Sequence, residues 1–264
     1  MKQTYEKIFG RNIGILNEDD QERLRQTKVA VLGLGGIGGV CFEVLVRSGI
    51  GRFSIVDRDT FDISNLNRQN LARHSSLGRL KIDMGEETAL EINPEVDVRK
   101  FLTINEENAT AILEGSHVVV HAIDTLRVCI IASRAARKLG IPLVEGWGLP
   151  FGNVRVITPT MPTLESLYGL PTEGRDISSI SDEMLRGLEF TLLKNLSAID
   201  GVLAHYQPDL ARRAMTGQIP SFAPMIWFTA VMMAIEVIKL RLERGKPAAM
   251  TEFTIYDPFE HVQR

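Results

Sequence analysis

Short apolar runs alternate with stretches of helical character over the first 160 residues of the chain. Six runs are rich in apolar and β-branched side chains, as expected of strands buried in a parallel sheet: residues 28–32, 52–56, 96–101, 117–122, 141–144 and 153–157. Three stretches between them are expected to be helices: residues 39–48, 78–92 and a segment that ends at Leu139. Strands that alternate with helices predict an α/β fold with a doubly wound, mainly parallel sheet and helices on both faces.

Polar side chains and glycine mark where several helices begin and end. Asn17 precedes three acids at residues 18–20, and this predicts a helix start because a capping side chain and acids stabilise the positive end of the helix dipole. That helix is expected to end near Gln26. Asn105 with the two acids after it predicts another helix start, and Gly140 is expected to cap the helix before it in the left-handed conformation.

The sequence changes in character after residue 158. Four residues that break regular structure predict a loop: Pro159, Pro162, Gly169 and Pro171. Residues 184–196 have helical character, whereas residues 172–180 and 200–220 have weak periodicity. Two interpretations of residues 160–222 remain open, a mobile crossover insertion over a site or a plain surface excursion.

Residues 224–242 form a strongly apolar stretch that is long enough to suggest a membrane span. Glu236, Lys239 and Arg241 favour instead a buried core helix or a dimer helix. Residues 252–257 predict a closing strand. The whole chain, residues 1–264, is therefore predicted to be one domain. Its parts are a core at about residues 28–160, the insertion at about 160–222, and the C-terminal helix and strand at 224–257.

Composition narrows the class of protein. The chain has 264 residues, 44% hydrophobic and 24% charged, which is typical of a globular domain with a substantial core. The net charge of −3 gives no sign of a polyanion partner, and the polar start of the chain does not resemble a secretory signal. Two cysteines, Cys41 and Cys129, cannot form a disulfide framework, so we expect a cytoplasmic protein without a membrane span.

A glycine-rich turn follows the first strand. Four glycines match the pattern G-x-G-x-x-G between that strand and the next helix: Gly33, Gly35, Gly36 and Gly38. Such a turn lets the backbone approach a phosphate at the N-terminus of a helix. Asp57 ends the second strand about twenty residues later, where an acid accepts hydrogen bonds from ribose hydroxyls. The pattern predicts a Rossmann-like fold that binds a nucleotide.

The segment after Asp57 distinguishes this chain from a dehydrogenase. Residues 57–59 read Asp-Arg-Asp, and residues 64–69 read Ser-Asn-Leu-Asn-Arg-Gln. These motifs resemble the ThiF/MoeB/HesA adenylyltransferases, relatives of the ubiquitin-activating enzymes. The resemblance extends to three further motifs: Gly-Arg-Leu-Lys at 78–81, Glu-Ile-Asn-Pro at 91–94 and Ala-Ile-Asp at 122–124. It covers about residues 5–160 and resumes from about 224 to 257.

The resemblance implies a reaction and a set of residues for it. A carboxylate attacks the α-phosphate of ATP and yields an acyl-adenylate and pyrophosphate, so cations and Mg²⁺ are needed to neutralise the developing charge. By resemblance, Arg68 and Lys81 contact phosphate, and Asp124 is the acid associated with magnesium. Asp57 contacts the ribose, and three polar residues belong to the same site: Asp59, Asn65 and Gln69.

The resemblance also implies a homodimer. In the family an arginine near the N-terminus reaches across a two-fold axis into the nucleotide site of the partner. Arg11 is the corresponding residue, although Arg11-Asn12-Ile13 stands here in place of the usual Arg-Gln-Ile.

Two departures from the family pattern argue against features that many family members have, a structural zinc and a covalent cysteine step. Thr163 and Ser166 occupy positions where many relatives have a zinc-binding C-x-x-C pair, so no structural zinc is expected. No cysteine follows Cys129, which argues against a thioester or persulfide step on this chain. We expect Cys129 to be a small buried apolar residue, and we assign no role to His117 or His121.

The sequence therefore predicts an ATP-dependent adenylyltransferase. By resemblance, the expected partner is a small ubiquitin-like sulfur-carrier protein with a C-terminal Gly-Gly carboxylate. A peptide or a carboxylated tRNA nucleoside remains an alternative acceptor, and nucleic acid binding is expected only in the tRNA case. An NAD-dependent oxidoreductase is a rival, although Arg68, Lys81 and Asp124 have no evident purpose around a nicotinamide. An inactive nucleotide-binding module is a third possibility, because the family's cysteines are missing.

Overall fold

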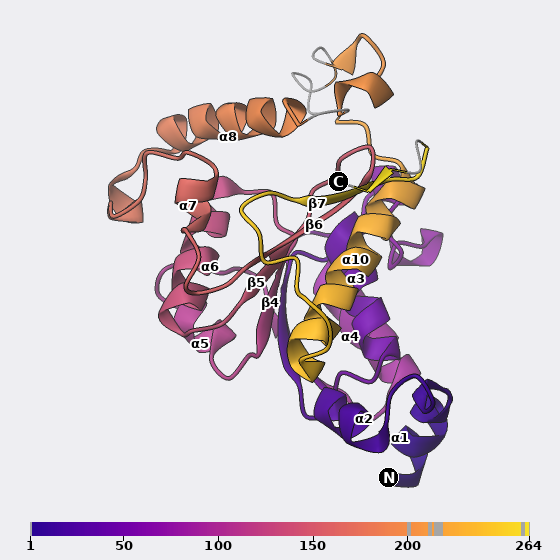
Figure 1. Cartoon of the computed structure of the whole chain (residues 1–264). Helices are drawn as coiled ribbons and strands as arrows, with labels where there is room; N and C mark the ends of the chain where they lie inside the picture. The colour runs from indigo at the N-terminus through magenta and orange to yellow at the C-terminus, as the bar shows by residue number, and fades with distance from the viewer. Residues whose placement is uncertain (1, 200–201, 211–212, 214–218, 260–261, 264) are drawn as a thin grey trace.

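The computed structural model describes residues 2–199, 202–210, 213, 219–259 and 262–263. Its centre is an eight-stranded sheet in the order β3-β2-β1-β4-β5-β6-β7-β8 (Figure 1). The strands are β1 Lys28–Leu32, β2 Arg52–Val56, β3 Asp97–Phe101, β4 Val118–His121, β5 Leu143–Glu145, β6 Gly152–Ile157, β7 Thr254–Asp257 and β8 Val262–Gln263. Strands β1 to β5 pair in parallel, and the pairs from β5 to β8 are antiparallel.

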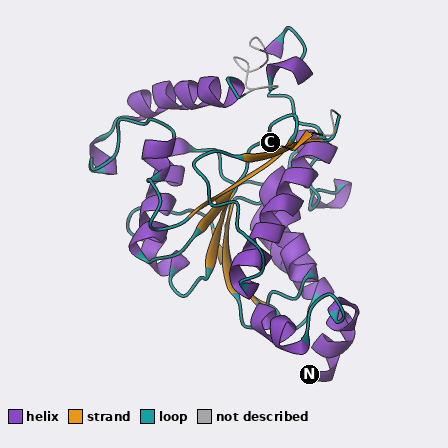
Figure 2. Ribbon diagram, in the orientation of Figure 1, coloured by secondary structure: helices purple, strands orange, loops and turns teal. Residues whose placement is uncertain are grey.

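Helices cover both faces of this sheet (Figure 2). They are α1 Lys2–Phe9, α2 Glu18–Arg25, α3 Gly36–Arg47, α4 Lys81–Ile92, α5 Ala109–Leu113, α6 Leu126–Lys138, α7 Leu164–Leu167, α8 Asp182–Ser197 and α10 Ala223–Leu242. Alternate residues of β4 belong to two different hydrophobic clusters. Val119 packs in the cluster with α5 and α6, whereas Val118 and Val120 pack in the cluster with α3 and α10. The predicted doubly wound α/β fold is confirmed.

Helix α10 is the apolar C-terminal helix that the sequence predicts. Among the described residues it is the one helix long and apolar enough to cross a membrane. In this fold it packs against α3 and the sheet. It also buries Glu236, whose carboxylate accepts hydrogen bonds from Lys239 Nζ at 2.6 Å and from the backbone N–H of Ala248 at 2.9 Å. The prediction of a core helix is therefore confirmed.

Several predicted boundaries need correction. The helix expected from Asn105 begins at Ala109, because the Asn105 side chain accepts backbone N–H bonds from residues 107 and 108 and forms a turn. The helix expected from Gly78 begins at Lys81, since Gly78 has a φ of 79°. The loop expected at residues 158–171 contains α7, which Thr163 caps by accepting the N–H of Ser166.

The insertion is attached to the domain by charged side chains. Arg134 on α6 forms two hydrogen bonds with Glu165 and two more with backbone carbonyls of the insertion. Glu189 on α8 accepts the backbone N–H of Leu126 at 3.2 Å, at the start of α6. Residues 200–201, 211–212 and 214–218 of the insertion lie outside the described residues. Whether the insertion is mobile stays an open prediction.

Candidate active site

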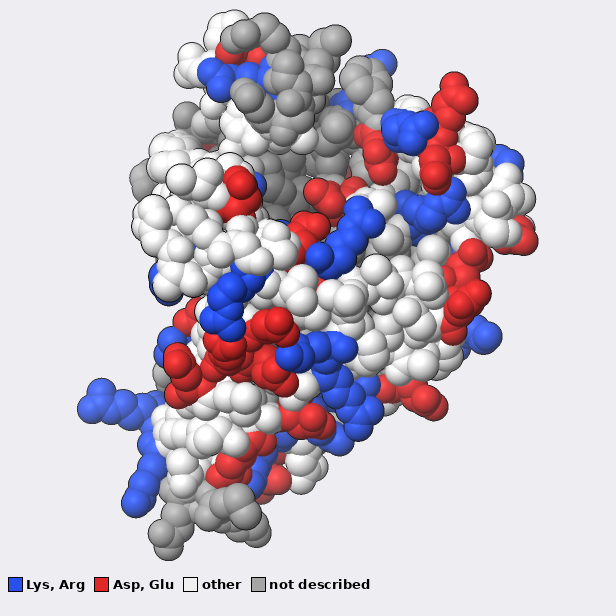
Figure 3. All heavy atoms as spheres, turned by 180° about the vertical axis from the view of Figure 1, so that it is seen from behind, with Lys and Arg blue, Asp and Glu red and all other residues white. Residues whose placement is uncertain are grey.

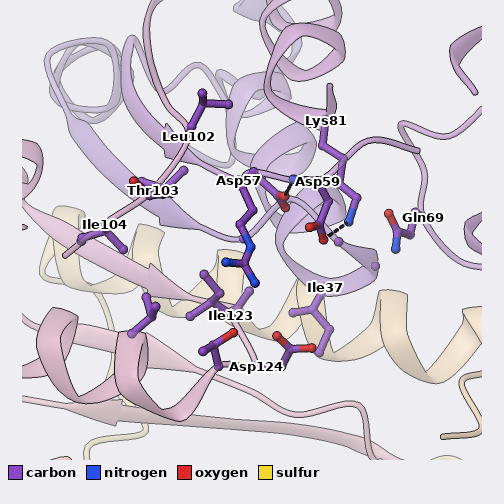
Figure 4. Close-up of a pocket in the computed structure, with 18 of the residues that line it drawn as sticks. Ile37, Asp57, Asp59, Gln69, Lys81, Leu102, Thr103, Ile104, Ile123 and Asp124 are labelled. Atoms are coloured by element: carbon purple, nitrogen blue, oxygen red, sulfur yellow. Dashed lines mark hydrogen bonds and ion pairs between the residues drawn. The ribbon is translucent and has the colours of Figure 1, made fainter. Parts of the chain in front are cut away.

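A cavity of about 380 Å³ lies at the carboxyl ends of β1, β2 and β4 (Figure 4). The strand order reverses between β1 and β4, the position at which doubly wound sheets bind ligands. Nine residues predicted from the sequence line it, Arg68 and eight others: Gly33, Gly35, Gly36, Asp57, Asp59, Gln69, Lys81 and Asp124. The structure therefore brings together segments that are almost one hundred residues apart.

The glycine turn lies against β4. Gly33 has a φ of 89°, and a Cβ atom there would lie 2.4 Å from the carbonyl oxygen of Ala122. A Cβ on Gly38 would lie 1.9 Å from the carbonyl oxygen of Gly33. Gly38 does not line the cavity, so its lack of a side chain serves the close packing of the turn. Helix α3 begins at Gly36, which presents its free N–H groups and positive dipole end to the cavity.

Gly33→Ala is expected to lower the free energy of unfolding by about 2–4 kcal/mol, because it adds both backbone strain and a steric overlap. Gly35→Ala is the matched control. Gly35 has a φ of −75°, and its added Cβ would meet nothing closer than Gln69 Nε2 at 3.9 Å. Its cost should stay below about 1 kcal/mol. Urea denaturation without nucleotide measures both, and equal costs would contradict the tight turn.

Asp57 ties the second strand to the glycine turn. Its side chain is buried, Oδ2 accepts the backbone N–H of Leu34 at 2.7 Å, and Oδ1 accepts the N–H of Asp59 at 2.8 Å. Each carboxylate oxygen retains a second lone pair. Asp57 can therefore hold the turn and still accept a ribose hydroxyl.

Lys81 supplies a buried positive charge at the start of α4. Its side chain is 8% exposed, and Nζ lies 3.1 Å from Oδ2 of Asp59, whose side chain is 60% exposed (Figure 4). In the described part of the chain this is the one ion pair of Lys81. An ammonium group has three N–H donors, so two remain for a ligand in the cavity.

The segment that follows β2 in the chain contains a second cation, Arg68, and several amide side chains. Arg68 is half-buried, and its Nη1 donates to the carbonyl of Ser64 at 2.9 Å and to Asn67 Oδ1 at 2.8 Å. Burial lowers the pKa of Arg68, but a guanidinium remains charged in proteins. The backbone carbonyl of Arg68 accepts the indole N–H of Trp227 at 2.8 Å, which connects this segment to α10.

The two amides predicted for the site behave differently. Gln69 is buried and lines the cavity, and its Oε1 has no hydrogen-bond partner among the described residues. Asn65 does not line the cavity, because its Oδ1 accepts the backbone N–H of Asp62 and caps a short turn. Sequence reasoning missed Arg58, which lines the cavity between Asp57 and Asp59 in the chain. Its place between two site residues was the available signal.

Asp124 follows β4 and is exposed at the cavity (Figure 4). No hydrogen bond or ion pair of its carboxylate is found among the described residues. Mg²⁺ is usually bound by one or two carboxylates together with the phosphates of a substrate. The uncommitted carboxylate of Asp124, on a cavity that also presents a helix N-terminus, fits that requirement.

Comparison with known proteins decides the family. The model of the ThiF family matches residues 9–263. The chain belongs to the ThiF family. This confirms the predicted family, and each shared motif except Glu-Ile-Asn-Pro at 91–94 contributes residues to the wall of the cavity.

The relatives of this ThiF-family chain carry the names of different enzymes. It is 38% identical over 144 residues to the tRNA threonylcarbamoyladenosine dehydratase of Bacillus subtilis, a match over 53% of this chain and 56% of that protein. It is 26% identical over 233 residues to the molybdopterin-synthase adenylyltransferase of Haemophilus influenzae, over 86% of this chain and 80% of that protein. The chain thus spans little more than half the length of the first of these relatives.

Solved structures support the fold. The crystal structure of PaaA has a TM-score of 0.71 and 24% identity, over 98% of this chain and 81% of that chain. The Escherichia coli tRNA N6-threonylcarbamoyladenosine dehydratase in complex with AMP has a TM-score of 0.66 and 19% identity, over 90% of this chain and 96% of that chain. At these identities the likeness shows the fold alone.

At the positions where many family members have zinc-binding cysteines, Thr163 and Ser166 make other contacts in this chain. Thr163 Oγ1 accepts the N–H of Ser166 and donates to Glu173 at 2.8 Å. The described residues contain no group of three or more metal-ligating side chains. The absence of zinc stays a prediction. Burial raises the pKa of both Cys41 and Cys129, which keeps these thiols protonated and unreactive.

Arg11 lies far from the cavity of its own chain. It is exposed in the turn that follows α1, near α2. Helix α2 contacts the C-terminal end of α10 through Asp20 and Arg244, whereas Ile226 at the other end of α10 lines the cavity (Figure 1). A helix of 20 residues is about 30 Å long. The role of Arg11 in a partner's site stays a prediction.

Proposed function

We propose that this ThiF-family protein uses ATP to adenylate a carboxylate. The observation that carries this proposal is the grouping of two cations, Lys81 and Arg68, with Asp124 around one cavity beside a glycine turn and a helix N-terminus. A carboxylate and a triphosphate repel each other, so the reaction needs fixed positive charge where they meet. A nicotinamide cofactor gives these three charges no comparable role.

Each part of the cavity has a role in this reaction. The glycine turn and the start of α3 hold phosphate oxygens, and Asp57 accepts a ribose hydroxyl. Apolar side chains offer a surface to the adenine base: Leu102, Ile104 and Val128. Lys81 and Arg68 stabilise the charge that grows on the α-phosphate and on the leaving pyrophosphate. Asp124 would hold Mg²⁺, which supplies further neutralisation of phosphate charge.

The relatives of this chain suggest more than one class of acceptor carboxylate. We favour the C-terminal Gly-Gly of a ubiquitin-like sulfur carrier, because the molybdopterin-synthase adenylyltransferase matches across 86% of this chain. A carboxylated tRNA nucleoside is the second candidate, since the relative with 38% identity is named a tRNA threonylcarbamoyladenosine dehydratase. On the face shown in Figure 3, basic side chains alternate with acidic ones and form no continuous basic surface of the kind that binds nucleic acid. We propose further that the protein is a homodimer and that it acts in the cytoplasm.

ATP with Mg²⁺ is expected to raise the melting temperature, whereas NAD⁺ is not. A ligand at one hundred times its dissociation constant stabilises the folded state by about 2.7 kcal/mol, or about 5–10 °C for a domain of this size. Differential scanning fluorimetry measures the shift, and ATP–pyrophosphate exchange with candidate carrier proteins, peptides and tRNA then identifies the acceptor. A shift with NAD⁺ alone would favour the oxidoreductase, and binding of ATP without exchange for any acceptor would favour an inactive module.

A further inference from the structure

The stem of Arg68 lies against the start of α3. A Cβ atom on Gly36, the first residue of that helix, would lie 3.4 Å from Cγ of Arg68 and 3.5 Å from its carbonyl oxygen. This helix N-terminus is the part of the cavity that is proposed to hold phosphate. The position of Arg68 beside the phosphates is therefore fixed by its stem, whereas the orientation of its guanidinium depends on contacts further along the side chain.

The guanidinium of Arg68 is held by one edge. Its Nη1 donates to the carbonyl of Ser64 at 2.9 Å and to Oδ1 of Asn67 at 2.8 Å, so both N–H groups of Nη1 are used. In the part of the chain that the structure describes, neither Nε nor Nη2 has a hydrogen bond or an ion pair. A guanidinium has five N–H donors, and the parallel N–H groups of Nε and Nη2 can bind two oxygens of one phosphate. The free edge is thus the one suited to a phosphate.

Asn67 connects the occupied edge of Arg68 to the end of the insertion. Its Nδ2 donates to the carbonyl of Ser221 at 2.9 Å, while its Oδ1 accepts from Arg68. These partners fix the orientation of the amide, because a guanidinium only donates and a backbone carbonyl only accepts. Ser221 lies two residues before α10 and lines the nucleotide cavity. The Asn67 side chain is therefore anchored at both of its polar atoms.

The backbone of Arg68 is fixed independently of Asn67. The indole N–H of Trp227 donates to the carbonyl of Arg68 at 2.8 Å, and the backbone N–H of Arg68 donates to the carbonyl of Asn65 at 3.2 Å. The freedom that remains to Arg68 is consequently that of its side chain. Of the two groups that hold its Nη1, the Asn67 amide is the one that a substitution can remove.

We propose that Asn67 is a positioning residue that holds the guanidinium of Arg68 with its free edge toward the phosphates of ATP. This inference rests on the proposed adenylation, in which Arg68 neutralises phosphate charge. A long arginine side chain loses much conformational entropy when a ligand fixes it. Asn67 removes part of that freedom before ATP arrives, so the contact between Arg68 and phosphate forms at a smaller entropic cost.

ATP is the probe for this inference, and adenosine is the matched ligand without phosphates. Asn67→Leu keeps the size of the side chain and removes both of its hydrogen bonds. Its affinity for ATP should fall about three- to tenfold, the loss expected when one hydrogen bond no longer supports the contact, and its affinity for adenosine should stay unchanged. Asn67→Gln retains the amide on a longer stem and should recover most of the affinity for ATP. Isothermal titration calorimetry with Mg²⁺ measures both ligands.

A double substitution tests whether Asn67 acts through Arg68. Arg68→Met removes the phosphate contact itself, so its affinity for ATP should fall about tenfold or more. The double variant Asn67→Leu/Arg68→Met should bind ATP no more weakly than Arg68→Met alone, because Asn67 then has no guanidinium to position. If the two losses multiply in the double variant, the positioning role is overturned.

Two controls separate positioning from a general effect on the fold. Asn195→Leu makes the same substitution at an exposed position of α8 and should change neither affinity. The hydrogen bonds of Asn67 lie at the surface, so Asn67→Leu should shift the melting temperature by less than about 3 °C. A lower melting temperature together with weaker binding of adenosine would show a merely structural role and overturn the inference.

The outcomes distinguish this inference from the proposed function. Equal affinity of Asn67→Leu and wild type for ATP would overturn the role of Asn67 and leave adenylation standing. A wild-type protein that binds ATP and exchanges pyrophosphate with no acceptor would overturn adenylation, while the affinities for ATP would still decide the role of Asn67. A wild-type protein that does not bind ATP would overturn both.

Discussion

Asp124→Ala is expected to slow ATP–pyrophosphate exchange by about 10²–10³-fold, and Lys81→Met should do the same. Each substitution removes one charge from a preorganised site, which typically costs that much in rate. Asp124 is exposed and has no partner among the described residues, so its removal should leave the melting temperature unchanged. Lys81→Met removes an ion pair with Asp59, whose side chain is 60% exposed. Such an exposed pair contributes less than about 1 kcal/mol to the free energy of unfolding.

Two surface charges provide matched controls for these variants. Asp97 is exposed at the start of β3, and Lys100 pairs with Asp83 and Glu86 outside the cavity. Asp97→Ala and Lys100→Met should retain the exchange rate of wild type. Asp57→Ala should act differently and weaken ATP binding, because Asp57 fixes the glycine turn through Leu34. Full exchange by Asp124→Ala would show that its assigned role is wrong.

Strands β1, β2, β4 and β5 of the parallel half could be predicted because they are buried on both faces, unlike the edge strand β3. Val118, Val119 and Val120 are fully buried in alternating directions, so the apolar run is continuous and easy to recognise. The antiparallel strands have no such continuous apolar run, and their sequences do not reveal the direction in which they pair. Strand β6 includes buried Asn153 and Arg155, whose partners come from other elements, and the sequence alone does not reveal these partners.

The nucleotide site could be predicted because its residues lie in short motifs at the ends of strands. A smaller hollow of about 110 Å³ beside it, at the carboxyl ends of β4 and β5, could not, since its wall combines β4 with a turn about 25 residues later in the chain. A histidine at the end of an apolar strand, such as His121, is more often a satisfied core residue. Only the structure shows that the neighbouring Glu145 is engaged by Arg155 and Tyr168, and that Nε2 of the buried imidazole has no hydrogen-bond partner among the described residues.

The insertion resisted prediction for a related reason. Its weak periodicity reflects short helices that are stabilised by long-range contacts and not by one amphipathic face. The interaction of Arg134 with Glu165 joins residues 31 positions apart, and that of Leu126 with Glu189 joins residues 63 positions apart. Such pairs have no local sequence signature.

Arg11→Ala is expected to be nearly inactive alone, yet to recover activity when it is mixed with Asp124→Ala. In the proposed homodimer, each site combines Arg11 of one chain with Lys81 and Asp124 of the other. A mixed dimer then has one doubly damaged site and one intact site. Random pairing makes about half of the dimers mixed, so about a quarter of all sites should be active, as two-fold closure requires. Co-refolding equal amounts of both variants and measuring pyrophosphate exchange tests this.

A second mixture provides the control for that experiment. Lys81 and Asp124 line the same cavity of one chain, so a mixed dimer of Lys81→Met and Asp124→Ala carries one lesion in each site. That mixture should stay inactive, whereas the mixture with Arg11→Ala should not. Recovery in both mixtures would mean that sites are shared in some other way. If Arg11→Ala is active alone, then Arg11 is an ordinary exposed residue, in keeping with its position at the opposite end of α10 from the cavity.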